Sequence, residues 1–85
     1  MAKVTIYTTP FCGYCQRAKG LLKRKNVSFA EIDVSSDDAA RKAMMTLANG
    51  RRTVPQIFID AAHVGGSDEL HALESAGKLD ALLVA

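Results

Sequence analysis

The spacing of hydrophobic and polar positions changes several times along the chain, and each change predicts a new element of secondary structure. Runs rich in β-branched and aromatic residues predict strands; they are residues 3–8, 28–34, 54–60 and a short strand from Val64. Apolar residues spaced by three and four positions predict helices; they lie within residues 13–25, 38–48, 67–76 and 78–84. This order predicts a parallel βαβ unit joined to a β-hairpin. We therefore expect an α/β fold with a four-stranded mixed sheet and helices on both faces.

The same spacing predicts the inward face of each helix. The residues expected there are Cys15, Ala18, Leu21 and Leu22; Ala40, Ala43, Met44 and Leu47; Leu70, Leu73 and Ala76; and Leu79, Leu82 and Leu83. Ser35, with Asp38 three residues later, has the form of a capping box for the second helix. Gly50 suits the left-handed position after that helix, and Ser67 is expected to cap the third.

Composition limits the chain to one domain, which we expect to cover residues 1–85 around one modest core. The net charge of +2 does not indicate a nucleic-acid-binding protein. The basic cluster at Lys19 and residues 23–25 is expected to be a solvated helix face that matches the helix dipole, rather than a binding patch. No run approaches the roughly 18 apolar residues of a membrane span. No signal peptide is visible at the start, so we expect a cytoplasmic location.

Both cysteines, Cys12 and Cys15, lie where the first strand-type run gives way to the first helix-type run. A Cys-x-x-Cys pair in this setting is typical of a redox-active dithiol. A helix N-terminus stabilises a thiolate through its free N–H groups and its dipole, and the thiolate is the form that attacks a disulfide. We therefore expect Cys12 to be the nucleophile and Cys15, one turn further along, to be the resolving cysteine.

Three other interpretations fit the cysteine pair less well. Inert buried thiols fit least, given Pro10 before the pair and Gly13 within it. A structural disulfide across so short a loop would constrain the unfolded chain little. A zinc site needs about four ligands, and the spacing of the other candidates, His63 and His71, fits no zinc-finger pattern.

Three motifs, taken in this order, point to a family. They are Cys12-Gly13-Tyr14-Cys15 after the first strand, Thr53-Val54-Pro55 at the third, and Gly65-Gly66-Ser67-Asp68 before the third helix. Together they resemble a glutaredoxin of the dithiol type, over essentially the whole chain. The resemblance implies a thioredoxin-like fold with Pro55 in the cis form beside the active-site sulfur. A thioredoxin would be expected to have Trp beside its cysteine pair, and this chain contains no Trp.

The resemblance also implies a set of glutathione-binding residues. They are Tyr14, Thr53, Val54, Pro55, Gly66, Ser67 and Asp68. The Val54 main chain would pair with the glutathione peptide as an added strand does, and the helix N-terminus at Ser67 and Asp68 would hold the γ-glutamyl carboxylate. Many relatives carry Lys three residues before the nucleophile, where this chain has Thr9. The alternatives for the glycine carboxylate are Arg41, Lys42, Arg51 and Arg52, of which Lys42 is preferred.

The resemblance implies a glutathione-dependent thiol–disulfide oxidoreductase that reduces protein disulfides and protein–glutathione mixed disulfides. Its expected partners are glutathione and those proteins, with no nucleic acid and no membrane, and it is expected to act as a monomer. The alternative is a [2Fe-2S] scaffold or carrier, in which Cys12 from each of two chains and two glutathione thiolates hold the cluster in a homodimer. Gly13 stands where the commoner motif has proline, which favours that alternative. A third interpretation is a thioredoxin-like electron donor fed by a reductase.

Overall fold

The computed structural model describes residues 2–84 and contains a single four-stranded mixed sheet in the order β2-β1-β3-β4. The strands are β1 Val4–Thr8, β2 Phe29–Asp33, β3 Gln56–Ile59 and β4 Ala62–Gly65. Strand β1 runs parallel to β2 and antiparallel to β3, and β3 forms an antiparallel hairpin with β4. The expected α/β fold with a four-stranded mixed sheet is confirmed.

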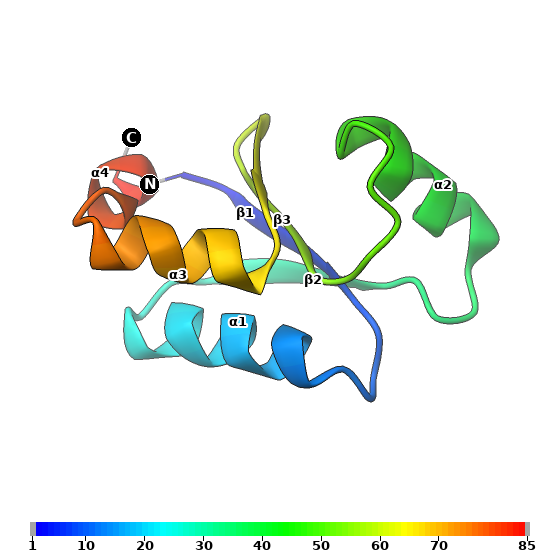
Figure 1. The fold of residues 1–85 in the computed structure, drawn as a ribbon, viewed down its shortest axis with the longest axis horizontal. Helices are drawn as coiled ribbons and strands as arrows, with labels where there is room; N and C mark the ends of the chain where they lie inside the picture. The colour runs from blue at the N-terminus through cyan, green and yellow to red at the C-terminus, as the bar shows by residue number, and fades with distance from the viewer. Residues whose placement is uncertain (1, 85) are drawn as a thin grey trace.

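Helices cover both faces of this sheet. They are α1 Gly13–Arg24, α2 Asp38–Leu47, α3 Ser67–Ser75 and α4 Leu79–Leu83. Figure 1 shows α1 and α3 side by side on one face, with α4 beyond α3, whereas α2 lies alone on the other. Within the described residues, no helix has the length and apolar character needed to cross a membrane.

The face under α1 and α3, called here the α1–α3 face, holds the larger part of the core. Alternation along the strands directs Val4, Ile6, Ile57 and Ile59 to this face. They pack with residues from the three helices, which are Ala18, Leu21, Leu22, Leu70, Leu79 and Leu83. Each buried Leu or Ile side chain contributes roughly 1.5–3 kcal/mol relative to an exposed one. The inward face predicted for the first helix is confirmed, because Cys15 is buried with its apolar neighbours.

The opposite face, called here the α2 face, has a smaller cluster. Its buried members are Tyr7, Val34, Met44, Ala48 and Phe58. The Tyr7 and Phe58 rings meet edge to face with centroids 5.7 Å apart. Helix α2 alone covers this face. It buries only a narrow stripe of its own surface, which packs against the sheet.

The structure corrects the prediction for α2. Met44 is fully buried, but Ala43 is exposed and Leu47 is 56% exposed. The buried stripe continues to Ala48 instead. Ser35 does not cap the helix; the Asp37 carboxylate is the N-cap and accepts the N–H of Ala40 at 2.9 Å. The Ser35 N–H instead donates to the Asp33 carboxylate, because a short acidic side chain competes for the local backbone donors there.

Other element ends also differ from the predictions. Ala76 is exposed because it is the C-cap of α3, and Leu82 is 39% exposed on the short helix α4. The return strand starts at Ala62, two residues before the predicted Val64, since the turn needs only two residues. Asn49, with φ 57°, takes the left-handed position after the α2 C-cap that was expected for Gly50, which follows it at φ 87°.

The basic cluster at the end of α1 is only partly a solvated face. Lys19 forms an ion pair with Glu31 at 2.9 Å. Lys25 contacts Glu74 at 2.8 Å and Asp80 at 2.7 Å, and so links the end of α1 to α3 and α4. The two basic residues in the last turn of α1 are exposed, as expected.

Candidate functional site

The two thiols lie at the N-terminus of α1, at different depths. Cys12 is the N-cap of the helix in an extended conformation, and its Sγ accepts the N–H of Cys15 at 3.4 Å. The Cys12 thiol also donates to the main-chain oxygen of Val54, with 3.7 Å between sulfur and oxygen. Cys12 is partly exposed, whereas Cys15 is completely buried. Only Cys12 is therefore open to a molecule arriving from solvent.

Burial sets the acid–base behaviour of Cys15. It is the largest of the causes that raise the pKa of this thiol from 9.0 to about 11; the backbone of Thr9 lowers the pKa, and the adjacent Cys12 raises it. A low-dielectric surrounding disfavours the charged thiolate. Cys15 is therefore a neutral thiol at physiological pH and does not compete with Cys12 for an approaching disulfide.

The loop before β3 faces the thiols. The Val54–Pro55 peptide bond is cis, in agreement with the expectation from the family resemblance. Pro55 is buried and Val54 is partly buried. With the Val54 oxygen in contact with Cys12, this loop brings a stretch of main chain directly to the sulfur.

A groove of about 230 Å³ opens next to this loop. It is lined by Tyr14, Arg51, Thr53, Val54, Pro55, Gly66, Ser67, Asp68 and Glu69. All seven glutathione-binding residues expected from the sequence are in this set, although they come from three separate parts of the chain. Tyr14 is 57% exposed at the rim beside the cysteine pair.

Lys42, the preferred partner for a glycine carboxylate, does not line the groove. It lies on α2 and is exposed. Arg51, another of the alternatives considered, does line the groove. Arg41 donates to the main-chain oxygen of Arg52 at 3.0 Å.

The start of α3 forms one wall of the groove. Ser67 is the first helical residue rather than the N-cap, and Gly66 occupies the N-cap position. Since the first N–H groups of a helix have no intrahelical acceptor, this end can receive an anion. The Glu69 carboxylate accepts the Gly66 N–H at 2.7 Å, which together with Arg51 holds the pKa of Glu69 below its ordinary value.

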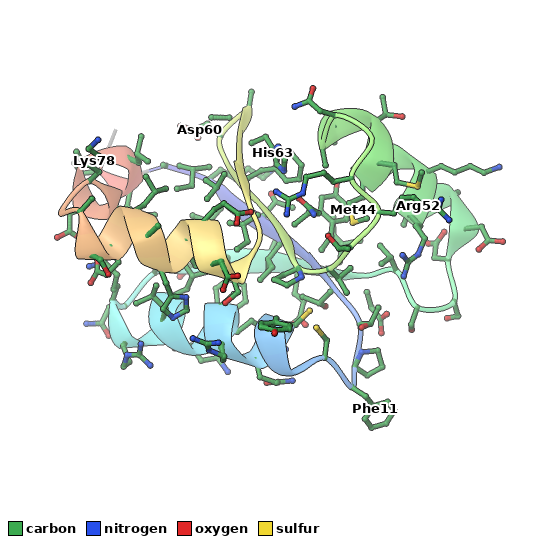
Figure 2. All side chains as sticks on the ribbon, viewed as in Figure 1. Phe11, Met44, Arg52, Asp60, His63 and Lys78 are labelled. Atoms are coloured by element: carbon green, nitrogen blue, oxygen red, sulfur yellow. The ribbon has the colours of Figure 1, made fainter. Side chains whose placement is uncertain are left out.

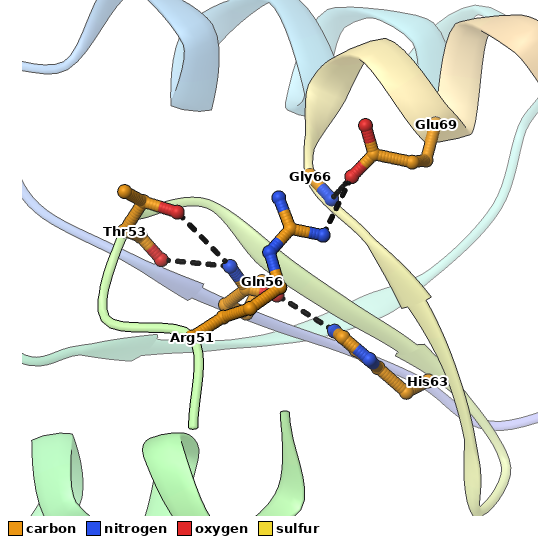
Figure 3. A network of polar contacts seen from close by, with 6 residues as sticks. All are labelled: Arg51, Thr53, Gln56, His63, Gly66 and Glu69. Carbon is orange, nitrogen blue, oxygen red and sulfur yellow. Dashed lines mark hydrogen bonds and ion pairs between the residues drawn. The ribbon is translucent and has the colours of Figure 1, made fainter. Parts of the chain in front are cut away.

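Arg51 and Glu69 join the two walls of the groove. The Arg51 guanidinium lies 2.8 Å from the Glu69 carboxylate (Figure 3). Gly65, with φ +116°, lies beneath this pair, and a Cβ there would collide with the Glu69 carboxylate and press on Arg51. The positive φ favours glycine at position 65, and a side chain there would displace the two ends of this pair.

A buried polar network lies behind the other wall, on the α2 face. The Gln56 side chain, fully buried, donates from Nε2 to the main-chain oxygen of Thr53 at 2.9 Å and contacts the Thr53 hydroxyl at 3.3 Å. Its Oε1 lies 2.7 Å from Nε2 of His63 (Figure 3). Burial lowers the pKa of His63, and Arg51 lowers it further.

Sequence reasoning did not assign functions to Glu69, Gln56 and His63. Glu69 carries a detectable signal, since an acidic residue three positions after a cap can reach back to it. Gln56 is the single polar residue within the apolar run of β3. A polar residue inside such a run indicates a buried hydrogen-bonding role.

The sequence and the fold of this chain are similar to those of known proteins. The glutaredoxin family profile matches residues 4–64. A glutaredoxin from Pseudomonas aeruginosa is 56% identical over 85 residues, covering 100% of both chains. The solution structure of glutaredoxin from Brucella melitensis has 55% identity and a TM-score of 0.86, covering 98% of this chain and 89% of that one.

A complex of buckwheat glutaredoxin with glutathione superimposes with a TM-score of 0.88 at 30% identity, covering 98% of this chain and 77% of that one. The thioredoxin-like arrangement of sheet and helices is thus shared with relatives of known structure. On the family match and the identity to relatives along its length, this chain belongs to the glutaredoxin family.

Proposed function

We propose that this protein is a glutathione-dependent thiol–disulfide oxidoreductase that acts on protein disulfides and on protein–glutathione mixed disulfides. The observation that carries the proposal is the position of one accessible thiol, Cys12, in contact with Val54 at the edge of a groove. Family membership supports the same activity, since glutaredoxins are glutathione-dependent oxidoreductases.

Glutathione is proposed to lie along the groove with its sulfur at Cys12. The Val54 main chain would pair with the tripeptide backbone, and Tyr14 would flank the cysteinyl part. The N-terminus of α3 and the exposed Asp68 carboxylate suit the γ-glutamyl carboxylate and ammonium groups. The bound glutathione of the buckwheat relative supports a glutathione site in this fold.

For the glycine carboxylate, we favour Arg51 over Lys42. Arg51 lines the groove and has N–H groups beyond the one that contacts Glu69. A guanidinium also binds a carboxylate with better geometry than an ammonium group does.

The reaction is proposed to begin with attack of the Cys12 thiolate on the glutathione sulfur of a glutathionylated protein. The S–S bond to the protein breaks, the protein thiolate leaves and takes up a proton, and a Cys12–glutathione disulfide forms. The thiolate of a second glutathione then attacks that disulfide, which releases Cys12 and oxidised glutathione. This cycle does not use Cys15.

A protein disulfide is proposed to require both cysteines. Cys12 forms a mixed disulfide with the substrate, and Cys15 loses its proton as it attacks the Cys12 sulfur. The substrate thiol leaves, and a Cys12–Cys15 disulfide remains for two glutathione molecules to reduce. A reducing compartment, such as the cytoplasm proposed here, keeps both thiols free between cycles.

The experiment couples turnover to NADPH oxidation through glutathione and glutathione reductase. We expect Cys15→Ser to retain turnover of a glutathionylated peptide and to lose reduction of a protein disulfide, because only the second reaction uses Cys15. Cys12→Ser, the matched control, should lose both activities. Loss of both activities in Cys15→Ser would contradict this division of roles, and an inactive wild-type protein would contradict the enzyme assignment.

A second candidate function is a [2Fe-2S] carrier, and the difference in burial between the thiols bears on it. Each chain offers one accessible cysteine, and no group of three or more potential metal-binding His, Cys, Asp or Glu residues occurs within residues 2–84. Two chains and two glutathione molecules would supply four thiolates. Anaerobic reconstitution with iron, sulfide and glutathione should then give a coloured dimer in which Cys12→Ser is colourless; colourless wild-type protein would exclude this function.

A further inference from the structure

The polar contacts of Gln56 fix its orientation by chemistry alone. The main-chain oxygen of Thr53 can only accept a hydrogen bond, so the Gln56 side-chain nitrogen must face it. The amide oxygen then faces His63 and can only accept. His63 must therefore carry a hydrogen on Nε2. Both its neutral Nε2–H tautomer and its protonated form meet this requirement.

The far end of this network is anchored in the core of the α2 face. His63 lies opposite Phe58 in the β3–β4 ladder, and the two rings stack with centroids 5.0 Å apart. Phe58 in turn meets Tyr7 edge to face. His63 is thus held by packing, and it holds the Gln56 amide from the other side.

The near end of the network reaches the groove. The Gln56 side chain bridges back over three residues to Thr53, across the loop that presents Val54 to Cys12. Thr53 is exposed and lines the groove, as Val54 does. Within the described residues, every buried side-chain nitrogen or oxygen has a partner, so loss of one member leaves another unpaired.

We propose that Gln56 and His63 are positioning residues for glutathione. His63 lies against the Phe58 ring and holds the Gln56 amide, which in turn fixes the Thr53 main chain. The Val54 main chain is then ready to pair with the tripeptide. This role rests on the proposed function, and it assigns these two residues to substrate binding rather than to the chemical step. Preorganisation of this kind strengthens binding because less freedom is lost when the ligand arrives.

The test measures kcat and KM separately for a glutathionylated peptide. Gln56→Met keeps the length of the side chain and removes its polar atoms. We expect KM to rise about five- to tenfold, the effect of one hydrogen bond's worth of positioning, while kcat stays within about twofold. Binding of S-methylglutathione, followed by NMR, should weaken by the same factor, because this probe cannot react.

Two further comparisons separate positioning from stability. Ile59→Val is the matched control, since it alters a buried residue of the same strand on the α1–α3 face and should leave KM unchanged. His63→Phe keeps the ring and loses the Nε2 donor, whereas His63→Gln keeps a donor of similar reach. We expect His63→Phe to raise KM and His63→Gln to restore part of the loss.

If the wild-type protein is active and Gln56→Met leaves KM unchanged, the inference is overturned. An equal rise of KM in Ile59→Val would also overturn it. If Gln56→Met does not fold, the two His63 variants provide the test. Equal KM values in His63→Phe and His63→Gln would then overturn the inference. Inactive wild-type protein would overturn the proposed function itself, and this inference with it.

Discussion

The two faces of the sheet are built differently. The α1–α3 face is covered by three helices and holds the larger apolar cluster. The α2 face is covered by one helix, and beside its smaller apolar cluster it carries the buried Gln56 and the partly buried His63. Figure 2 shows Met44 and His63 on this second side, away from the loop tip at Phe11.

One sheet therefore serves two purposes. The α1–α3 face supplies stability and holds the helix N-termini that border the groove. The α2 face supplies hydrogen bonds that reach the groove from behind, through Gln56 and Thr53. Apolar packing carries little directional information, whereas a buried hydrogen bond sets an orientation. We therefore expect substitutions on the two faces to affect stability and binding unequally.

The largest expected effect comes from matched leucine substitutions on the two faces. Leu22→Ala, at a fully buried site on the α1–α3 face, should lower the free energy of unfolding by about 3 kcal/mol, because it leaves a cavity. Leu47→Ala, on α2 and 56% exposed, should change it by no more than about 0.5 kcal/mol. Urea unfolding followed by circular dichroism measures both. Similar losses would mean that Leu47 is packed as Leu22 is, and that α2 buries a broader stripe than the structure shows.

A smaller effect concerns ionisation of Cys15, on the buried side of α1. Because its folded-state pKa is raised to about 11, the neutral thiol stabilises the fold fully below 9.0. That contribution is lost as pH rises from 9.0 through about 11. In Cys12→Ser, the thiolate absorbance at 240 nm should appear with a midpoint well above 9.0. The variant lacking both cysteines provides the tyrosine background to subtract. A midpoint near 9.0 would show that burial does not control this thiol.

Sequence reasoning succeeded where apolar spacing alone decides the structure. The buried stripe of α1 from Cys15 to Leu22 is predicted correctly. Helix α1 packs against the sheet and its neighbouring helices, so the face that it buries is broad and its apolar spacing is clear. It failed at Ala43 and Leu47, since helical spacing does not reveal how narrow a stripe a single covering helix buries. It also failed at Ser35, because Ser and Asp are both good caps and only the backbone path selects Asp37.

The candidate site was predictable to a similar degree. The family motifs identified seven residues that line the groove. Lys42 was preferred among four cations for the glycine carboxylate, whereas the folded chain brings Arg51, and not Lys42, to the lining of the groove. The contribution of Gln56 was also missed, since a hydrogen bond to Thr53 and His63 together depends on three-dimensional placement.

The contact among Arg51, Gly65 and Glu69 has a consequence for what a substitution at position 65 would do. Any side chain at position 65 would collide with the Glu69 carboxylate and crowd Arg51, which belongs to a different part of the chain. The φ of +116° strains any other residue there, and an added side chain would also force the Glu69 carboxylate and the Arg51 guanidinium to move. One substitution at position 65 would therefore both strain the turn and displace the link between the two walls of the groove.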